Sequence, residues 1–322
     1  MKPHHRILAA ALVGNSLCSV PALAWNNFGH MAVAAVAWER MSEPAKARAI
    51  ALLRLNPNFD DFVAANTPAD KRDKYAFMAA ATWPDMIKRL PAYHSDGAHN
   101  GDVPPDTPAA SQNTGYDDKA RHKYWHFVDE PFSTDNTPLQ PAKVPNAQDR
   151  IATFRATLPP NSGANDDIRS YDLVWLEHLV GDIHQPLHAT SRFSRDLPDG
   201  DAGGNEVKIH CGQVHRCGAS ELHAYWDDLL GPDETTAEDV EVVADSLRDA
   251  DATAAAVTNE SVWVKESFTA AKSVIYKSPP IGNGEGPFTL THGYDTKAKA
   301  LADKRVALAG ARLANMLNAA FK

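Results

Sequence analysis

Cysteine is scarce in this sequence, with three residues among 322. A dense framework of disulfides is therefore excluded as the main source of stability. Beyond the first residues, the sequence also lacks a hydrophobic run of the roughly 20 residues that a membrane-spanning helix requires. Hydrophobic residues make up 43% and charged residues 23% of the chain, which is ordinary for a globular protein and excludes an intrinsically disordered one.

An excess of basic charge is absent as well. The chain holds 32 Lys and Arg against 41 Asp and Glu, a formal net charge of -9. A broad basic face, the usual electrostatic footprint of a protein that binds duplex nucleic acid, is therefore excluded. Any chemistry on phosphate would need a local source of positive charge, such as bound metal.

The first 24 residues resemble a targeting signal. Lys2 and Arg6 precede an apolar run from Ile7 to Val13, and Ala22-Leu23-Ala24 fits a cleavage site. This order predicts a secretory signal peptide over residues 1–24 that is cleaved after Ala24; the alternative is a buried N-terminal helix. We therefore expect a secreted or periplasmic protein without stable membrane association.

The two cysteines after residue 24 are close neighbours. Cys211 and Cys217 would lie in a compartment that permits disulfides, so we expect a bridge between them. Two free thiols are the alternative.

Apolar periodicity predicts helices over most of the remaining chain. They are expected at 30–55, with a break at Ser42-Glu43-Pro44, and at 74–89, 167–187, 236–277 and 296–321. Segments 91–120 and 132–147 are rich in proline, glycine and small polar residues, which is typical of loops. Alternation near Gly203-Gly204 predicts a hairpin within 190–222 that carries the cysteine pair at its tip. The sequence thus predicts one all-α domain over residues 25–322, with long loops and one small β-hairpin.

Histidine and aspartate recur at helical spacing. His178 and Asp182 form one H-x-x-x-D pattern, and His223 and Asp227 form another. On a helix, positions i and i+4 share a face, so each pair presents an imidazole and a carboxylate together. This donor set suits zinc. His188 follows across Gln185-Pro186, where the proline ends the helix and lets the chain return to the same site. A single such pair is more often an exposed or capped pair than a metal site.

The other histidines are expected in different roles. His184 is predicted to lie behind the ligands, because it points away from the face of His178 and Asp182. His126, within an aromatic run, is by itself more typical of a buried core histidine. The remaining ones are expected at the surface: His94, His99, His122, His210 and His215.

Several short motifs follow one another along the chain. The most specific is the string from Gly181 to His188, G-D-x-H-Q-P-L-H. The others are Trp25 to His30, Thr82 to Asp85, Trp125 to Asp129, Gly203 to Asn205, Leu222 to Asp227, Trp263 to Ser267 and Ala309 to Ala314. In content and order they resemble the three-zinc nucleases of the S-one and P-one type that act on single strands. Pro84 departs from the family, which usually has alanine there, and we expect it to affect the direction of the Asp85 carboxylate.

The resemblance implies three zinc ions and a particular ligand set. One ion would be bound by Asp85, His126, His178 and Asp182. A second would be bound by His188, His223 and Asp227. The third would take His30, Asp182 and the backbone amine and carbonyl of Trp25, with Asp182 bridging it to the first. A free α-amino group can be neutral near neutral pH and bind metal, so cleavage after Ala24 would complete the site.

The resemblance also implies a substrate. The enzyme would be a monomeric phosphodiesterase that cleaves single-stranded DNA and RNA to 5′-phosphorylated products and also hydrolyses 3′-nucleotides. Phe127 and Asp129 match the nucleoside-binding positions, with core packing as the alternative for Phe127. Lys88 would contact charge developing on the phosphate, unless it is simply solvated. Two other functions stay open: a zinc phospholipase C of related architecture, and a periplasmic zinc-binding protein without catalysis.

Overall fold

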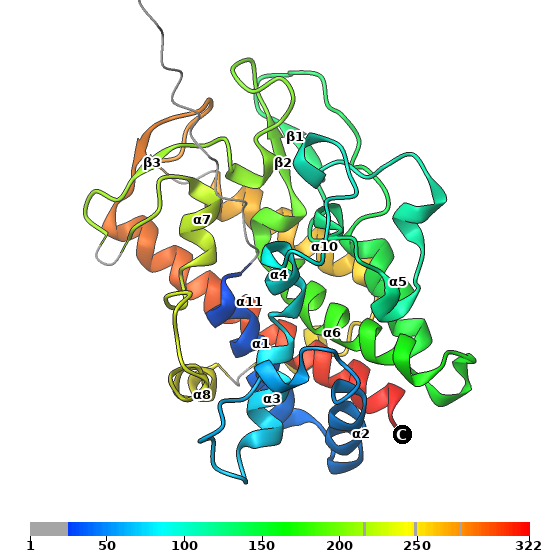
Figure 1. Cartoon of the computed structure of the whole chain (residues 1–322). Coiled ribbons are helices and arrows are strands. Elements are labelled where there is room, and N and C mark those ends of the chain that lie inside the picture. Colours follow the sequence, from blue (N-terminus) through cyan, green and yellow to red (C-terminus); the bar gives the residue numbers. More distant parts are fainter. Residues whose placement is uncertain (1–24, 215–216, 248–249, 277–278) are drawn as a thin grey trace, which may run out of the picture.

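Helices dominate the computed structural model, which describes residues 25–322 except 215–216, 248–249 and 277–278 (Figure 1). The predicted signal peptide and His215 lie outside the described residues. The α-helices are α1 Asn27–Arg40, α2 Glu43–Leu53, α3 Arg72–Ala80, α4 Trp83–Met86, α5 Ala147–Thr157, α6 Asp166–Asp182, α7 Leu222–Asp227, α8 Ala237–Ser246, α9 Ala252–Ala255, α10 Glu260–Ala270 and α11 His292–Ala320. The strands are β1 Pro131–Ser133, β2 Ser191–Phe193, β3 Ile209–His210 and β4 Phe288–Thr289. The prediction of a mainly helical single domain is confirmed.

Local sequence signals set the ends of the first helices. Ser42 caps α2 by accepting a hydrogen bond from the Ala45 N–H, and proline stands in the first turn, where its missing N–H costs nothing. The predicted break between two helices in 30–55 is therefore confirmed. Segment 74–89 is likewise divided, because α3 ends at Ala80 and α4 begins at Trp83 with Pro84 in its first turn.

Three helices form the centre of the molecule. α1, α6 and α11 contact one another and cross its middle (Figure 1). Gly310 lets α11 approach α1 closely, because a methyl group there would lie 2.6 Å from the Val36 Cβ. In α6, every residue from Arg169 to Asp182 is buried. The metal-ligand candidates His178 and Asp182 therefore project from the most enclosed helix.

Short parallel strands join distant loops beside this centre. β1 pairs with β2, with Phe132 opposite Arg192, and just before the pairing the Val128 N–H donates to the His188 carbonyl at 2.7 Å. This pairing holds the segment of His126 against the segment of His188. α6 ends at Asp182, before the proline that was expected to end it, and Pro186 begins η8, a 3-10 turn over Pro186–Ala189.

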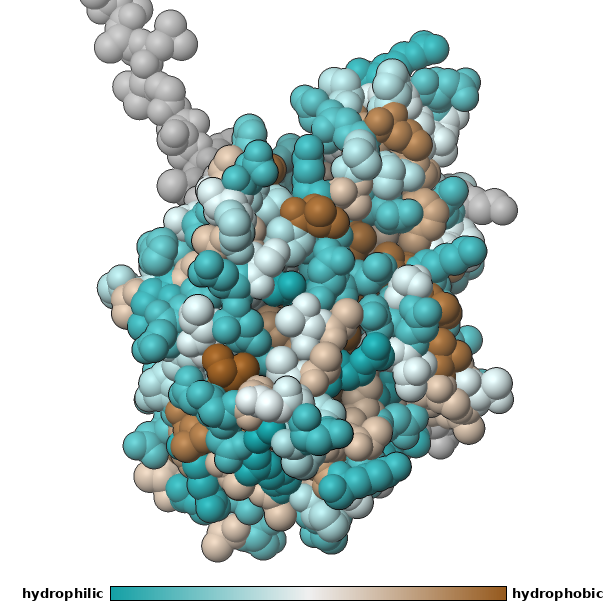
Figure 2. Space-filling model, turned by 90° about the vertical axis from the view of Figure 1, so that its right-hand side faces the viewer, coloured by the Kyte–Doolittle hydropathy of each residue, from teal (hydrophilic) through white to brown (hydrophobic). Residues whose placement is uncertain are grey.

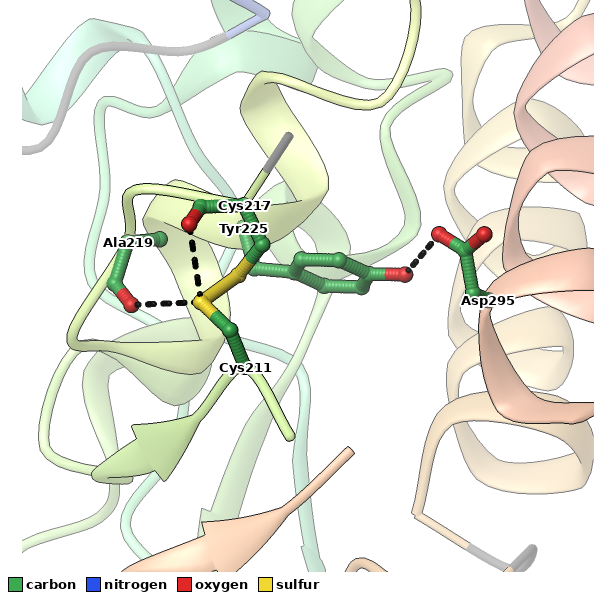
Figure 3. The surroundings of a disulfide bond; sticks show 5 residues. All are labelled: Cys211, Cys217, Ala219, Tyr225 and Asp295. Carbon is green, nitrogen blue, oxygen red and sulfur yellow. Dashed lines mark hydrogen bonds between the residues drawn. A yellow bond between two sulfur atoms is a disulfide. The ribbon is translucent and has the colours of Figure 1, made fainter. Parts of the chain in front are cut away.

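The segment expected as a hairpin folds back on itself through one antiparallel bridge between Lys208 and Glu221. β2, at the start of this segment, pairs with β1, and β3 pairs in parallel with β4 instead of with a neighbour in sequence. The Cys211–Cys217 disulfide closes the loop, with 5.7 Å between the Cα atoms. Figure 3 shows it beside α7, from which the Tyr225 hydroxyl donates to Asp295 of α11 at 2.9 Å.

The surface mixes polar and apolar residues. On the face in Figure 2, hydrophobic residues occur in small separate groups among hydrophilic ones. Within the described residues, no helix is both long enough and apolar enough to cross a membrane.

Candidate metal centre

Five buried side chains from distant parts of the chain converge on one cluster, which we call the main cluster: His30, Asp85, His126, His178 and Asp182. The His126 Nδ1 lies 2.9 Å from the His178 Nε2 and 3.1 Å from an Asp182 oxygen. Asp85 Oδ1 is 3.7 Å from the His178 Nε2. These are separations between atoms that would share one cation.

The two oxygens of Asp182 face different histidines. Oδ2 lies 3.3 Å from the His178 Nε2, whereas Oδ1 lies 3.3 Å from the His30 Nε2. One carboxylate thus reaches both sides of the main cluster. This is the arrangement that a carboxylate bridging two ions requires.

A second group lies next to the first and consists of His188, His223 and Asp227, here called the side cluster. The two Nε2 atoms of His188 and His223 are 2.9 Å apart, and an Asp227 oxygen lies 3.5 Å from the His223 Nε2. The His188 Nδ1 donates a hydrogen bond to the His126 carbonyl at 2.8 Å, so a ligand candidate of the side cluster contacts the backbone of one in the main cluster.

Backbone carbonyls fix the protonation of three of these imidazoles. The Nδ1 atoms of His178, His188 and His223 lie 2.7, 2.8 and 2.8 Å from the carbonyls of Ala81, His126 and Gly203. A carbonyl can only accept a hydrogen bond, so each Nδ1 carries the proton and each Nε2 presents a lone pair. Two lone pairs facing each other at 2.9 Å repel unless a cation lies between them.

Burial shifts the pKa values of four side chains of the main cluster. It lowers the pKa of His30, His126 and His178 well below the usual value, with help from nearby cationic groups. The imidazoles are therefore neutral, which is the form that binds metal. Burial, and then Asp85, raise the pKa of Asp182 well above its usual value.

Several buried polar atoms of the main cluster have no hydrogen-bond partner among the described residues: both ring nitrogens of His30, Nε2 of His126, Oδ2 of Asp85 and Oδ1 of Asp182. Buried polar groups are normally satisfied, so such a gathering needs an explanation. A metal ion would satisfy the two carboxylate oxygens and the His30 Nε2, which lies 3.3 Å from Asp182 Oδ1, and imidazole with carboxylate is a donor set that zinc accepts. The residues present therefore fit zinc.

Two glycines make room for the ligands. A methyl group on Gly181 would lie 2.9 Å from the His30 Nδ1 and 3.9 Å from the Trp25 Cδ1. Gly203 has a φ of +62°, and a methyl group there would lie 2.4 Å from the Leu187 carbonyl oxygen. The close approach of the His30 ring explains why a glycine stands immediately before Asp182. Trp25 is fully buried at this place.

Asp85 and Lys88 form a buried pair. The Lys88 Nζ lies 2.6 Å from Asp85 Oδ1, and both side chains are 4% exposed. Lys88 is therefore not a solvated surface lysine. Pro84 in α4 leaves the Asp85 side chain directed into the main cluster.

Phe127 and Asp129 line a pocket next to the clusters. Its volume is about 140 Å³, and Asp102, Tyr124 and Asn146 are among its other walls. Phe127 is partly exposed and also packs against the hydrophobic core, so its side chain contacts both the core and the pocket. Burial raises the pKa of Asp129 to about 7, with Asp201 and Asp102 adding to the shift.

The remaining histidines lie away from the clusters. His184 is buried, with Nδ1 on the Val180 carbonyl and Nε2 2.9 Å from an Arg312 nitrogen, while His94, His99 and His210 are exposed. The surface prediction for His122 is wrong, because this residue is 2% exposed. Asp96 and Asp118 lie 2.7 and 2.8 Å from its two ring nitrogens and satisfy them inside the protein.

Gln185 belongs to the site but was not predicted to. Its side-chain Nε2 donates to an oxygen of Asp227 at 2.9 Å. Its position between Asp182 and His188 in the sequence is the only signal that could have indicated such a role.

Comparisons with known proteins show the family of this chain. Residues 25–322 match the family model described as S1/P1 Nuclease. The chain is 25% identical over 229 residues to Endonuclease 3 of Arabidopsis thaliana, a match that covers 70% of this chain and 58% of the length of that relative.

Proposed function

We propose, because this chain belongs to the S1/P1 nuclease family, that it is a zinc-dependent phosphodiesterase. It cleaves single-stranded DNA and RNA to 5′-phosphorylated products and hydrolyses 3′-nucleotides. The observation that carries the proposal is the pair of imidazole lone pairs 2.9 Å apart in the side cluster, each fixed by a carbonyl bond on the opposite nitrogen.

Three ions would occupy the two clusters. Asp85, His126, His178 and Asp182 would hold one, and His188, His223 and Asp227 the second. His30, the other oxygen of Asp182 and the backbone of Trp25 would hold the third. The 3.3 Å distances from Asp182 to both His178 and His30 support the shared carboxylate. Zinc bound here supplies Lewis acidity and concentrated positive charge toward a phosphodiester.

The chain's own residues would orient the substrate. Phe127 would stack on a base, and Asp129 would hydrogen-bond to base N–H groups within the pocket that both line. Stacking requires an unpaired base, which favours single strands over duplexes. Lys88, held by Asp85 beside the main cluster, would contact charge that develops on the phosphate. These groups favour a nucleotide substrate over a phospholipid.

The test uses protein that starts at Trp25. It should cleave single-stranded DNA, RNA and a 3′-nucleotide faster than duplex DNA, and leave phosphatidylcholine intact. EDTA should abolish the activity and zinc should restore it. Asp182→Asn should lower the rate by about 100-fold or more, since even changes behind metal ligands cost 10–100-fold. The exposed Asp70→Asn makes the same charge change as a control. Activity that survives exhaustive chelation would refute the proposal.

A further inference from the structure

Gln185 is fully buried between the end of α6 and η8. Its backbone N–H donates to the Asp182 carbonyl at 2.9 Å, so its position is tied to a ligand of the main cluster. Its side-chain Oε1 accepts the Leu187 N–H at 2.6 Å. Because a backbone N–H only donates, the orientation of this amide is determined.

The fixed amide leaves Nε2 for one partner, Asp227. That nitrogen donates to Asp227 Oδ1 at 2.9 Å. The other oxygen, Oδ2, is the one that lies 3.5 Å from the His223 Nε2. One oxygen of Asp227 is therefore engaged by Gln185, and the other faces the two imidazoles of the side cluster.

We propose that Gln185 is a positioning residue that restricts Asp227 to binding metal through one oxygen, which keeps a coordination position in the side cluster free for substrate. The inference rests on the proposed function. Three protein ligands with an open position are typical of catalytic zinc sites, whereas four protein ligands are typical of structural ones. A carboxylate that turned to offer both oxygens would fill the open position.

The same contact couples the two clusters. Gln185 bonds through its backbone to Asp182 and through its side chain to Asp227. A shift of the α6 end would therefore be transmitted to the side cluster. These two contacts explain why a glutamine stands at position 185, between the ligand candidates Asp182 and His188.

Two variants test the contact. Gln185→Glu keeps the acceptor for Leu187 but replaces the donor by a carboxylate that repels Asp227, and Gln185→Met removes the donor without adding charge. The exposed Gln213→Glu is the matched charge control. Circular dichroism and urea unfolding of each metal-free protein verify the fold, and competition with a chelator measures the release of each zinc ion.

We expect one of the three ions to be held about 10–100-fold less tightly in both Gln185 variants, as for other groups that orient metal ligands. The other two ions should be held as in the wild type, and kcat for a 3′-nucleotide should fall more than KM rises. Gln213→Glu should match the wild type. Unchanged binding of all three ions, or equal weakening of all three, would overturn the inference.

A crystal structure of the zinc-loaded wild type gives a second reading that does not depend on the folding of a variant. Asp227 should bind through Oδ2 alone, with Oδ1 on Gln185. An active, zinc-loaded enzyme in which Asp227 binds through both oxygens would overturn this inference and leave the proposed function standing. A wild type without zinc in the side cluster would overturn both.

Discussion

Three histidines derive their chemistry from backbone carbonyls far away in the sequence. His178 bonds to Ala81, His188 to His126 and His223 to Gly203. The spacing of histidine and aspartate could indicate which side chains gather, because i and i+4 share a helix face. It could not indicate the tautomers, because the accepting carbonyls reach the site only through the tertiary fold.

Gly181→Ala tests whether activity and zinc binding require the close approach of the His30 ring to α6. The added methyl group would lie 2.9 Å from the His30 Nδ1 and push that ring out of place. Alanine is the better helix former by about 1 kcal/mol, so α6 itself should not be weakened. We expect activity to fall by about 10–100-fold, as for other losses of ligand orientation, together with part of the zinc content.

Gly293→Ala in α11 is the control for this exchange, since a methyl group there would lie within 4 Å of no atom in the described part of the chain. It should leave both zinc content and rate as in the wild type. A Gly181→Ala protein with full zinc content and unchanged rate would show that the approach of His30 is not required.

One buried histidine, His122, holds together distant parts of the long loop between α4 and α5. His122 precedes η6 (Lys123–Trp125) and stacks on Trp125 with 3.5 Å between ring centroids. Asp96 and Asp118 lie on either side of its ring. The loop carries Asp102, a wall of the pocket that Phe127 lines. His122 therefore links the part of the loop around Asp96 to Trp125, the residue just before His126.

The contacts of His122 with Asp96 and Asp118 predict that the stability of the protein depends on pH. Burial disfavours the charged imidazole, but hydrogen bonds to Asp118 and Asp96 outweigh it and raise the pKa of His122 above its usual value. A group whose pKa is higher in the folded state stabilises the fold fully below its unfolded pKa of about 6.5 and loses that effect as the pH rises through the folded pKa. His122→Gln should lower the free energy of unfolding by about 3 kcal/mol at pH 6.

Urea unfolding of the wild type and the variant from pH 6 to pH 9 measures this difference. The two curves should approach each other as the pH rises. A cost that is the same at every pH would mean that the charge of His122 contributes nothing.

Helices with a strong apolar periodicity could be predicted from the sequence. Strands that form only by pairing with a segment far away in the chain could not. The break at Ser42-Glu43-Pro44 followed from capping chemistry alone. The parallel pairing of β3 with β4 joins segments that are almost 80 residues apart, and nothing in either short segment indicates the other. His122 looked like a surface residue for a similar reason. Asp118 stands only four residues before it, but Asp96, which binds the other ring nitrogen, lies 26 residues before it.

Over the whole molecule, the clusters draw on α1, α4, α6, η8, α7 and the residue after η6. The fold thus places lone pairs and carboxylates from most of the chain at one buried place within a protein of net charge -9. The family resemblance could supply the ligand list, whereas the sequence alone could not show that Asp182 faces both His30 and His178. Positive charge from bound ions would resolve the conflict between an acidic chain and an anionic substrate.

We propose that these side chains and the Trp25 backbone hold three zinc ions, which elemental analysis of active protein that starts at Trp25 can measure. We predict three zinc ions per chain. Active protein that contains no transition metal would show that the clusters work without zinc and would refute the proposal.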